Sequence, residues 1–357
     1  MQRMRTLAGI SILALVLAAC SSGASDTAAE GGMEETTAAV ADDSNCAAAE
    51  SFCVGLVTDI GKVDDKSFNQ SAHEGAMAAA AEVGGFYKYI ETTDTKDYAA
   101  NMKQFTDKSY DVIVTVGFLM AEATVVAAKE NPNTKFIGVD QFQAEEVANV
   151  TGLIFPEDQA GYAAGYLAGL LTKTNKLGQV LGLEIAPVQK FAKGFEAGAK
   201  AANGNVSVTT VYHPPADNGF ADPVWGAAEA KKQLSQGADI IFGAGGGTGN
   251  GALIEIAKAE GAGTSIFCIG VDTDQWGTVP EAQPCLVTSA MKGLTEGTSD
   301  LVKAAFDGSI AGGNFLGTTG LADYHDLASA VPADVQSKVA EVVAGLKDGS
   351  IQTGVTL

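Results

Sequence analysis

The chain has 357 residues, of which 46% are hydrophobic and 43 are glycine, and it carries a formal net charge of −21. A chain of this length can bury a large core and usually divides into two domains. Nucleic acid and anionic lipid repel so acidic a protein, which excludes nucleic acid as a partner and favours small molecules or basic protein surfaces.

The N-terminus has the features of a bacterial lipoprotein signal peptide. Arg3 and Arg5 give a basic start, and the apolar run Leu7–Leu17 is too short to span a bilayer. Small residues then lead into Cys20. The pattern predicts a signal peptide at residues 1–19, cleavage before Cys20 and lipidation of Cys20, with palmitate among the lipids. The alternative is an ordinary secretory signal in which Cys20 is incidental.

A lipid on Cys20 would hold the protein at the outer, extracytoplasmic face of the cell membrane. Residues 20–50 are rich in Ser, Gly, Ala, Thr, Asp and Glu and contain no Lys or Arg. Such a segment buries too little apolar surface to fold, so we expect a lipidated flexible linker. No later apolar run approaches about 18 residues, so we expect no other part of the chain to span a membrane.

Besides Cys20, the chain contains four cysteines: Cys46, Cys53, Cys268 and Cys285. An even number in an oxidising compartment predicts two disulfides, and proximity in sequence favours Cys46–Cys53 and Cys268–Cys285. The alternative is four buried free thiols. A metal site is not expected, because the chain has no Cys-x-x-Cys and its three histidines are far apart in the sequence.

From residue 52 onward, predicted strands and helices alternate, which indicates parallel sheets covered by helices on both faces. The alternation pauses near Val150–Phe155 and then resumes, so the chain contains two similar series. Strands are expected at 52–58, 88–91, 111–116, 136–139, 179–183, 206–212, 239–242, 266–271, 286–289 and near 315–318. Helices are expected at 68–81, 98–108, 121–130, 160–171, 191–202, 225–236, 252–260, 294–306 and 334–346.

The two series predict an α/β protein with two doubly wound parallel-sheet lobes joined by a crossover hinge. The last part of the chain is too short for a third domain, so we expect it to complete the first two. Lobe 1 is expected at 51–155 plus 286–312, and lobe 2 at 156–285 plus 313–357.

Ligands of open parallel sheets bind beyond the C-terminal ends of the strands. Polar or glycine-rich segments occupy these ends here: Asp59, Gly117, Asp140, Gly243–Gly251 and Asp272. No Gly-x-Ser-x-Gly elbow and no clustered carboxylates support hydrolytic catalysis, so we expect no enzyme activity.

The glycine-rich segment also fits the pattern Gly247-x-Gly249-x-x-Ala252 of a dinucleotide site. An extracytoplasmic protein has no nicotinamide pool to draw on, so we expect no cofactor. The glycines are better explained by close approach of backbone N–H groups to a ligand.

The loop at 57–70 holds a large ring, Phe68, in otherwise polar surroundings, which makes it a candidate platform for stacking on a ligand. Ser67 or Asn69 is expected to cap the following helix. The alternative is a capping box with a hydrophobic staple, in which Phe68 belongs to the core.

Four motifs at these positions resemble a known family: Asp64–Gln70, Glu157–Gly169, Ala244–Gly249 and Ile269–Gln275. An extracytoplasmic lipoprotein with two such lobes resembles the substrate-binding protein of an ABC importer. Such proteins have the type I periplasmic-binding-protein fold. The motifs are similar to those of the basic membrane protein family, which includes purine nucleoside receptor lipoproteins. The resemblance covers nearly everything from residue 52 onward.

The resemblance implies a site in which Phe68 stacks on a purine and Asn69 and Asp140 lie near the base. Asp59 and Asp272 would accept from ribose hydroxyls. Gly245, Gly246 and Lys292 would assist them, and Lys66, Ser67 and Gln70 belong to the same motif. Phe191 fits the second stacking ring best, with Phe220 and Trp225 as competitors, and Trp276 departs from the family pattern and could narrow the pocket.

The sequence therefore predicts a monomeric binding protein that closes on a purine nucleoside and delivers it to ABC permease subunits. One alternative is the same scaffold with another small solute, such as a sugar or signalling molecule. A second, from a different class, is a secreted nucleoside hydrolase or oxidoreductase. A third is a surface adhesin.

Overall fold

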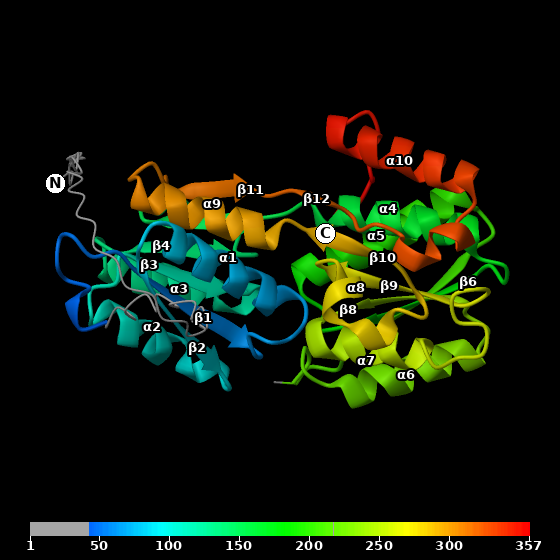
Figure 1. Ribbon diagram of the computed structural model, residues 1–357, viewed down its shortest axis with the longest axis horizontal. Coiled ribbons are helices and arrows are strands. Elements are labelled where there is room, and N and C mark those ends of the chain that lie inside the picture. The colour runs from blue at the N-terminus through cyan, green and yellow to red at the C-terminus, as the bar shows by residue number, and fades with distance from the viewer. Residues whose placement is uncertain (1–42, 217) are drawn as a thin grey trace, which may run out of the picture. The chain divides into compact units, whose positions relative to one another are not determined.

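Figure 1 shows the computed structural model, which describes residues 43–216 and 218–357. The predicted signal peptide, Cys20 and most of the predicted linker lie outside this part of the chain. In the described ranges, no helix combines the length and apolar character needed to cross a bilayer.

The first sheet has six strands in the order β11-β5-β4-β3-β1-β2, and every neighbouring pair is parallel. Its central strands are buried along their length, as expected for a sheet covered on both faces. The strands are β1 (Cys53–Ile60), β2 (Phe86–Thr92), β3 (Val112–Val116), β4 (Lys135–Val139), β5 (Val150–Ile154) and β11 (Gly313–Leu316).

The helices of this lobe form two layers, one on each face of the sheet. Alanines of α1 and leucines of α9 share one hydrophobic cluster with the sheet, and Met102 and Phe105 of α2 share the other. Figure 1 shows α9 beside α1, although the two are far apart in sequence. The helices are α1 (Phe68–Glu82), α2 (Tyr98–Thr106), α3 (Ala121–Glu130) and α9 (Leu294–Phe306).

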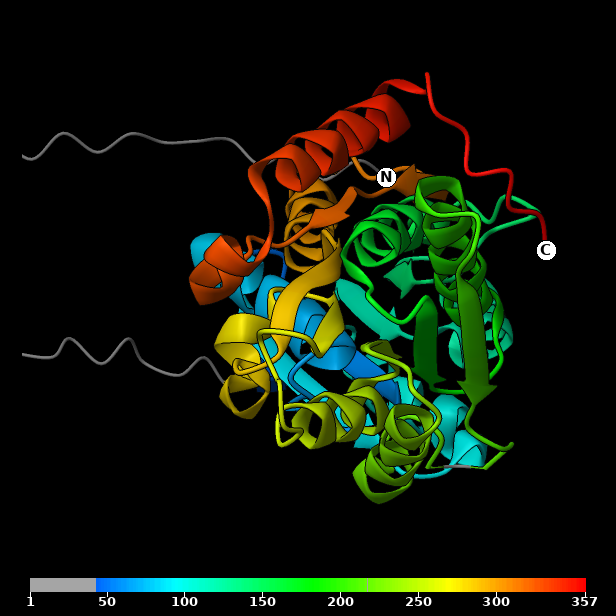
Figure 2. The same cartoon turned by 90° about the vertical axis from the view of Figure 1, so that its right-hand side faces the viewer.

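The second sheet has the order β12-β10-β9-β8-β6-β7 and is parallel except for its edge strand β12, which pairs antiparallel with β10. Figure 2 shows helices on both of its faces. The strands are β6 (Lys176–Leu181), β7 (Ser207–Tyr212), β8 (Ile240–Ala244), β9 (Phe267–Asp272), β10 (Leu286–Lys292) and β12 (Thr319–Leu321). The helices are α4 (Glu157–Leu171), α5 (Ala186–Ala202), α6 (Pro223–Ser235), α7 (Gly246–Ile256), α8 (Gln275–Thr278) and α10 (Ala333–Asp348).

The predicted fold class is confirmed: both lobes are doubly wound parallel sheets. The limits of the lobes differ from the prediction in two strands. β10 pairs with β9 in lobe 2, not lobe 1, and β11 pairs with β5 in lobe 1, not lobe 2. The chain therefore crosses between the lobes three times, after β5, after β10 and after β11.

The close packing of α4 on α5 fixes the position of one side of the cleft. A Cβ atom at Gly161 would lie 2.3 Å from the carbonyl oxygen of Phe191, and one at Gly165 would lie 1.9 Å from that of Phe195. Only glycine allows the two backbones to approach this closely. The spacing of the glycines on α4 therefore determines how close the backbone of Phe191 on α5 lies to α4.

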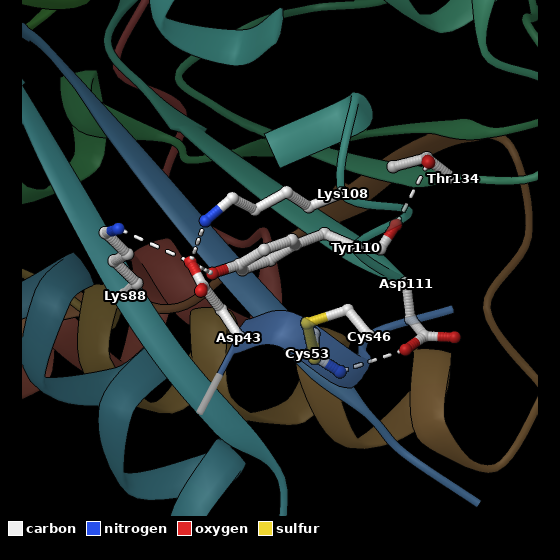
Figure 3. The surroundings of a disulfide bond; sticks show 8 residues. All are labelled: Asp43, Cys46, Cys53, Lys88, Lys108, Tyr110, Asp111 and Thr134. Carbon is white, nitrogen blue, oxygen red and sulfur yellow. Dashed lines mark hydrogen bonds and ion pairs between the residues drawn. A yellow bond between two sulfur atoms is a disulfide. The ribbon is translucent and has the colours of Figure 1, made fainter. Parts of the chain in front are cut away.

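Residues 43–50 pack on lobe 1 rather than continuing the predicted linker. Asp43 begins a short 3-10 helix, and its carboxylate meets Lys108 at 2.7 Å and Lys88 at 3.4 Å (Figure 3). Cys46 is buried and bonded to Cys53 at the start of β1 (Figure 3). The folded body therefore includes part of the segment that composition alone marks as linker.

The second disulfide joins Cys268 on β9 to Cys285 just before β10. Both cysteines are fully buried among side chains of α7 and its neighbours. Both bonds match the pairing expected from proximity in sequence.

Candidate functional site

A partly open cavity lies at the C-terminal ends of strands from both sheets. This is where open parallel sheets bind ligands. Lobe 1 contributes residues that follow β1, β3 and β4, and lobe 2 contributes the ends of β8, β9 and β10 and the start of α5. Nine residues expected at the site line it: Asp59, Phe68, Asn69, Asp140, Phe191, Gly245, Gly246, Asp272 and Lys292.

Two phenylalanine rings from different lobes reach the cavity. Phe68 is the first residue of α1 and Phe191 lies in the second turn of α5. Each ring also packs against the core of its own lobe. Of the two competitors for the second ring, Phe220 lines the cavity, whereas Trp225 does not and packs edge-on against His213.

Trp276 does not narrow the cavity, contrary to expectation. It lies outside the lining residues and stacks on the ring of His325, with the ring centroids 4.9 Å apart. Trp276 is the second residue of the short helix α8, and its ring also packs against the core cluster around α7.

A carboxylate from each lobe meets the cavity at the end of a central strand. Asp59 ends β1 and accepts hydrogen bonds from the backbone of Ile60 and Leu119 and from the Tyr98 hydroxyl. Burial raises the pKa of Asp59, and the hydrogen bond from Tyr98 opposes this rise. Asp272 ends β9 and accepts from the Ser67 hydroxyl at 2.8 Å, across the two lobes. Burial raises its pKa too, against the opposing charge of Lys292.

Lys292 is the one cationic side chain among the lining residues, and its charge is already balanced. Its Nζ lies 2.7 and 2.6 Å from the two carboxylate oxygens of Asp140 and 3.2 Å from Glu157. Burial alone would lower the pKa of Lys292, but the surrounding carboxylates outweigh it and raise the pKa. The ammonium group also lies 5.2 Å from the Phe68 ring centroid and 5.6 Å from that of Phe191.

Asn69 lines the cavity and carries a side-chain oxygen that has no hydrogen-bond partner among the described residues. Its side chain is 6% exposed, and Oδ1 makes no hydrogen bond within the described part of the chain. A buried amide oxygen without a partner is costly, so a ligand donor at this position would be stabilising. This supports the expected place of Asn69 beside a ligand.

Asp65 lines the cavity although the sequence prediction did not select it. Its carboxylate accepts hydrogen bonds from the backbone amides of Ser67, Asn69 and Gln70, and so caps α1 in place of a Ser67 or Asn69 side chain. Burial raises the pKa of Asp65 to about 6, although these three amides oppose the rise. An acidic residue three positions before the first helical residue is the signal that identifies it.

Three residues of the same motif lie outside the lining. The Lys66 side chain is exposed and Gln70 bonds Glu74, one turn along α1. Ser67 is fully buried and directs its hydroxyl to Asp272 rather than to the cavity. Consecutive residues at a helix start point in different directions, so the motif cannot place all of them at one surface.

Gly245 and Gly246 bring backbone to the cavity at the start of α7. Gly245 has φ +149°, and a Cβ there would lie 2.4 Å from the backbone nitrogen of Gly182. Gly246 has φ +52°. These values explain the glycines without a dinucleotide site.

The apolar wall formed by the start of α5 was also missed. Ile185, Pro187 and Val188 line the cavity beside Phe191. Pro187 stands at the first turn of α5, where proline is favoured. These residues follow strand β6, and segments that follow a parallel strand lie at the ligand-binding edge of the sheet. That position could have predicted the apolar wall from the sequence.

The family model described as Bmp, ABC transporter substrate-binding protein PnrA-like, matches residues 52–323. A CD4+ T-cell-stimulating antigen of Listeria monocytogenes is 34% identical over 320 residues, covering 84% of this chain and 87% of that protein. Basic membrane protein A of Borreliella burgdorferi is 34% identical over 241 residues, covering 67% and 68%. The ABC transporter nucleoside-binding protein BmpA of Lactococcus lactis is 33% identical over 227 residues, covering 62% and 63%.

Solved structures support the fold. The ABC transporter solute-binding protein of Aeropyrum pernix superposes with a TM-score of 0.75 at 24% identity, covering 84% of this chain and 92% of that one. A solute-binding protein of Conexibacter woesei gives a TM-score of 0.64 at 23% identity, covering 85% and 98%. At these identities the likeness concerns the architecture of the two lobes.

Proposed function

Because the chain belongs to the family of PnrA-like ABC transporter substrate-binding proteins, we propose that it binds a purine nucleoside between its lobes and delivers it to the importer's permease. The protein acts as a monomer, and a lipid on Cys20 tethers it to the outer face of the cell membrane. It binds its ligand without chemical change.

The observation that carries this proposal is the pair of rings that reach one cavity from different lobes. Phe68 and Phe191 offer aromatic surfaces to a flat, largely apolar ligand such as a purine base. Asn69 lines the same cavity, and its amide oxygen, which has no partner among the described residues, would accept a hydrogen bond from the base.

The charged groups favour a neutral ligand with hydroxyl donors. Four carboxylates line the cavity, those of Asp59, Asp65, Asp140 and Asp272, against the single ammonium of Lys292. Ionised carboxylates only accept hydrogen bonds, so ribose hydroxyls suit Asp59 and Asp272. An anionic ligand would meet repulsion in an environment of low dielectric constant. The name of the Lactococcus lactis relative, a nucleoside-binding protein, agrees with this choice.

A thermal-shift panel tests the proposal. Inosine, adenosine and guanosine should raise the melting temperature, because a ligand that binds only the folded state stabilises it by mass action. Ribose and amino acids should leave the melting temperature unchanged. Stabilisation by sugars and none by nucleosides would contradict the proposal and favour the sugar-binding alternative.

Two further measurements separate binding from catalysis. Mass spectrometry of ligand released from denatured protein should find an intact nucleoside, since tight-binding receptors often purify with ligand. Chromatography of inosine incubated with the protein should find no free base. Release of hypoxanthine would instead identify a nucleoside hydrolase.

A further inference from the structure

The loop between β1 and α1 also contacts lobe 2 through two of its backbone carbonyl groups. The carbonyl oxygen of Asp65 accepts a hydrogen bond from Asn250 Nδ2 at 2.8 Å. The carbonyl oxygen of Lys66 accepts one from Thr278 Oγ1 at 2.8 Å and another from Gln275 Nε2 at 3.3 Å. We call this contact, of residues 64–67 with Asn250, Gln275 and Thr278, the loop latch.

The lobe 1 side of the loop latch is held rigidly by its own chain. Lys66 has φ +62°, in the left-handed region that side chains other than glycine rarely adopt. The carboxylate of Asp65 accepts three backbone amides at the start of α1, which fixes the loop around that residue. The loop therefore presents its two carbonyl groups from a defined main-chain conformation.

The lobe 2 side is prepared to receive these carbonyl groups. Gln275 is fully buried, and its Oε1 accepts from the backbone nitrogen of Val271 at 2.9 Å. Its Nε2 donates to Asn250 Oδ1 at 2.8 Å as well as to the loop. The side-chain amides of Asn250 and Gln275 are thus oriented by hydrogen bonds within lobe 2. This lowers the entropic cost of donating hydrogen bonds to the loop.

None of Asn250, Gln275 and Thr278 lines the cavity, so each acts without touching a ligand. We propose that these three are positioning residues, which hold the loop against lobe 2 and so set how long the cleft stays closed around any ligand. Bonds made only when the lobes are together stabilise the closed state by the same amount whatever the ligand. The latch therefore governs affinity and release rate, and leaves the choice of ligand to the cavity. This inference concerns closure and does not require the ligand to be a nucleoside.

The test removes latch hydrogen bonds in two steps. Thr278→Val replaces one hydroxyl by a methyl group of similar shape. Asn250→Ala added to it removes the bond to the Asp65 carbonyl oxygen and the bond that Asn250 Oδ1 accepts from Gln275 Nε2. Thr264→Val is the matched control, because the Thr264 hydroxyl also donates to a carbonyl oxygen, that of Gly261 at 3.0 Å, but within lobe 2. The melting temperature of each ligand-free variant shows whether it folds.

The first readout is the release rate of inosine and adenosine, measured by stopped-flow fluorescence. Loss of a single net hydrogen bond should raise it roughly three- to ten-fold. Thr278→Val should speed release of both nucleosides by the same factor, the double variant should speed it further, and Thr264→Val should match the unaltered protein. Release rates equal to those of the control would overturn the proposal, as would a change confined to one nucleoside, because that would indicate contact with the ligand.

If neither nucleoside binds, the proposed function is wrong, but the latch can still be tested by small-angle scattering. In that case the radius of gyration of the double variant should exceed that of Thr264→Val, since the lobes would spend more time apart. Equal radii would overturn the latch.

Discussion

Single residues at this site combine buried charge with backbone strain. Asp140 and Asp272 both have positive φ, 61° and 67°, where each ends a strand and turns its carboxylate into the cavity. Such conformations cost on the order of 1–3 kcal/mol each and persist where the surrounding structure enforces them. Both lobes bear this cost, at residues that line the cavity.

Phe68→Ala tests the stacking role directly. The ring lines the cavity but also packs on the lobe 1 core, and Phe68 is the first residue of α1, where the predicted helix 68–81 begins. We expect nucleoside affinity to fall by roughly 1–3 kcal/mol, from lost ring burial and stacking, with a small fall in melting temperature. Calorimetry measures the affinity, and Phe315→Ala, which removes an exposed ring on β11, is the control. Unchanged affinity with a large loss of stability would mark Phe68 as a core residue, as the staple alternative states.

The buried carboxyl groups also predict the pH dependence of stability. Burial raises the pKa of Asp59, Asp65, Asp140 and Asp272, that of Asp65 to about 6. A raised carboxyl pKa means that the folded state binds the proton more tightly than the unfolded state, so stability rises as the pH falls through these values. The ligand-free melting temperature should therefore increase from about pH 7.5 to about pH 5.5.

His73 has the opposite effect on stability. Burial lowers its pKa, so the unfolded chain binds this proton at a higher pH than the folded protein does, and acidification favours the unfolded state at this residue. Asp65→Asn, which cannot ionise, should show a smaller rise in melting temperature over the same interval. A melting temperature that falls steadily on acidification of the unaltered protein would contradict the prediction.

At the scale of elements, the sequence predicted which segments form strands and helices far better than it predicted their partners. β10 and α9 are separated by Gly293 alone, yet they belong to different lobes. β11 and β12 are likewise neighbours in the chain but lie in different sheets. Local apolar pattern specifies a buried strand, whereas the choice of sheet depends on contacts distant in sequence.

The same limit applied to the site. Residues at strand ends, such as Asp59 and Asp272, could be found because parallel strands end at one edge of a sheet. Asp65 lies beside Asp64 in an acidic pair, and only the start of α1 decides which carboxylate caps it. The bonds of the loop latch end on backbone carbonyls, which carry no signal in the side-chain sequence.

The Cys46–Cys53 disulfide should stabilise the N-terminal edge of lobe 1 (Figure 3). Replacing both cysteines by serine should lower the free energy of unfolding by about 2–3 kcal/mol, the value expected for a short closed loop. Denaturant unfolding measures this, and nucleoside affinity should not change, because the bond is remote from the cavity lining. Asp43→Asn is a suitable comparison, since its ion pairs with lysines at the surface are screened by water and add little stability. Four free thiols on non-reducing peptide mapping would contradict both disulfides.

At the scale of the whole body of residues 43–357, three crossovers and a set of interlobe hydrogen bonds connect two otherwise separate cores. The buried pair of Lys292 and Asp140 joins the end of β10 to the end of β4. When the lobes separate, water solvates these two charges. When the lobes close, the two charges must be well paired, since an uncompensated buried charge is costly. Closure is therefore sensitive to the pairing of Lys292 with Asp140 and Glu157.

Asp272 joins recognition to closure, because its carboxylate faces the cavity and accepts from Ser67 of the other lobe. Inosine can donate ribose hydroxyls to the remaining lone pairs, but 2′,3′-dideoxyinosine cannot, and an unsatisfied buried acceptor should weaken its binding by roughly 1–3 kcal/mol. Asp272→Asn should reduce this difference, since an amide can also donate. Ser67→Ala should weaken both ligands equally and keep the difference, because it removes only the bond between lobes. Calorimetry with both ligands on the three proteins measures these effects, and equal affinities on the unaltered protein would place the sugar away from Asp272.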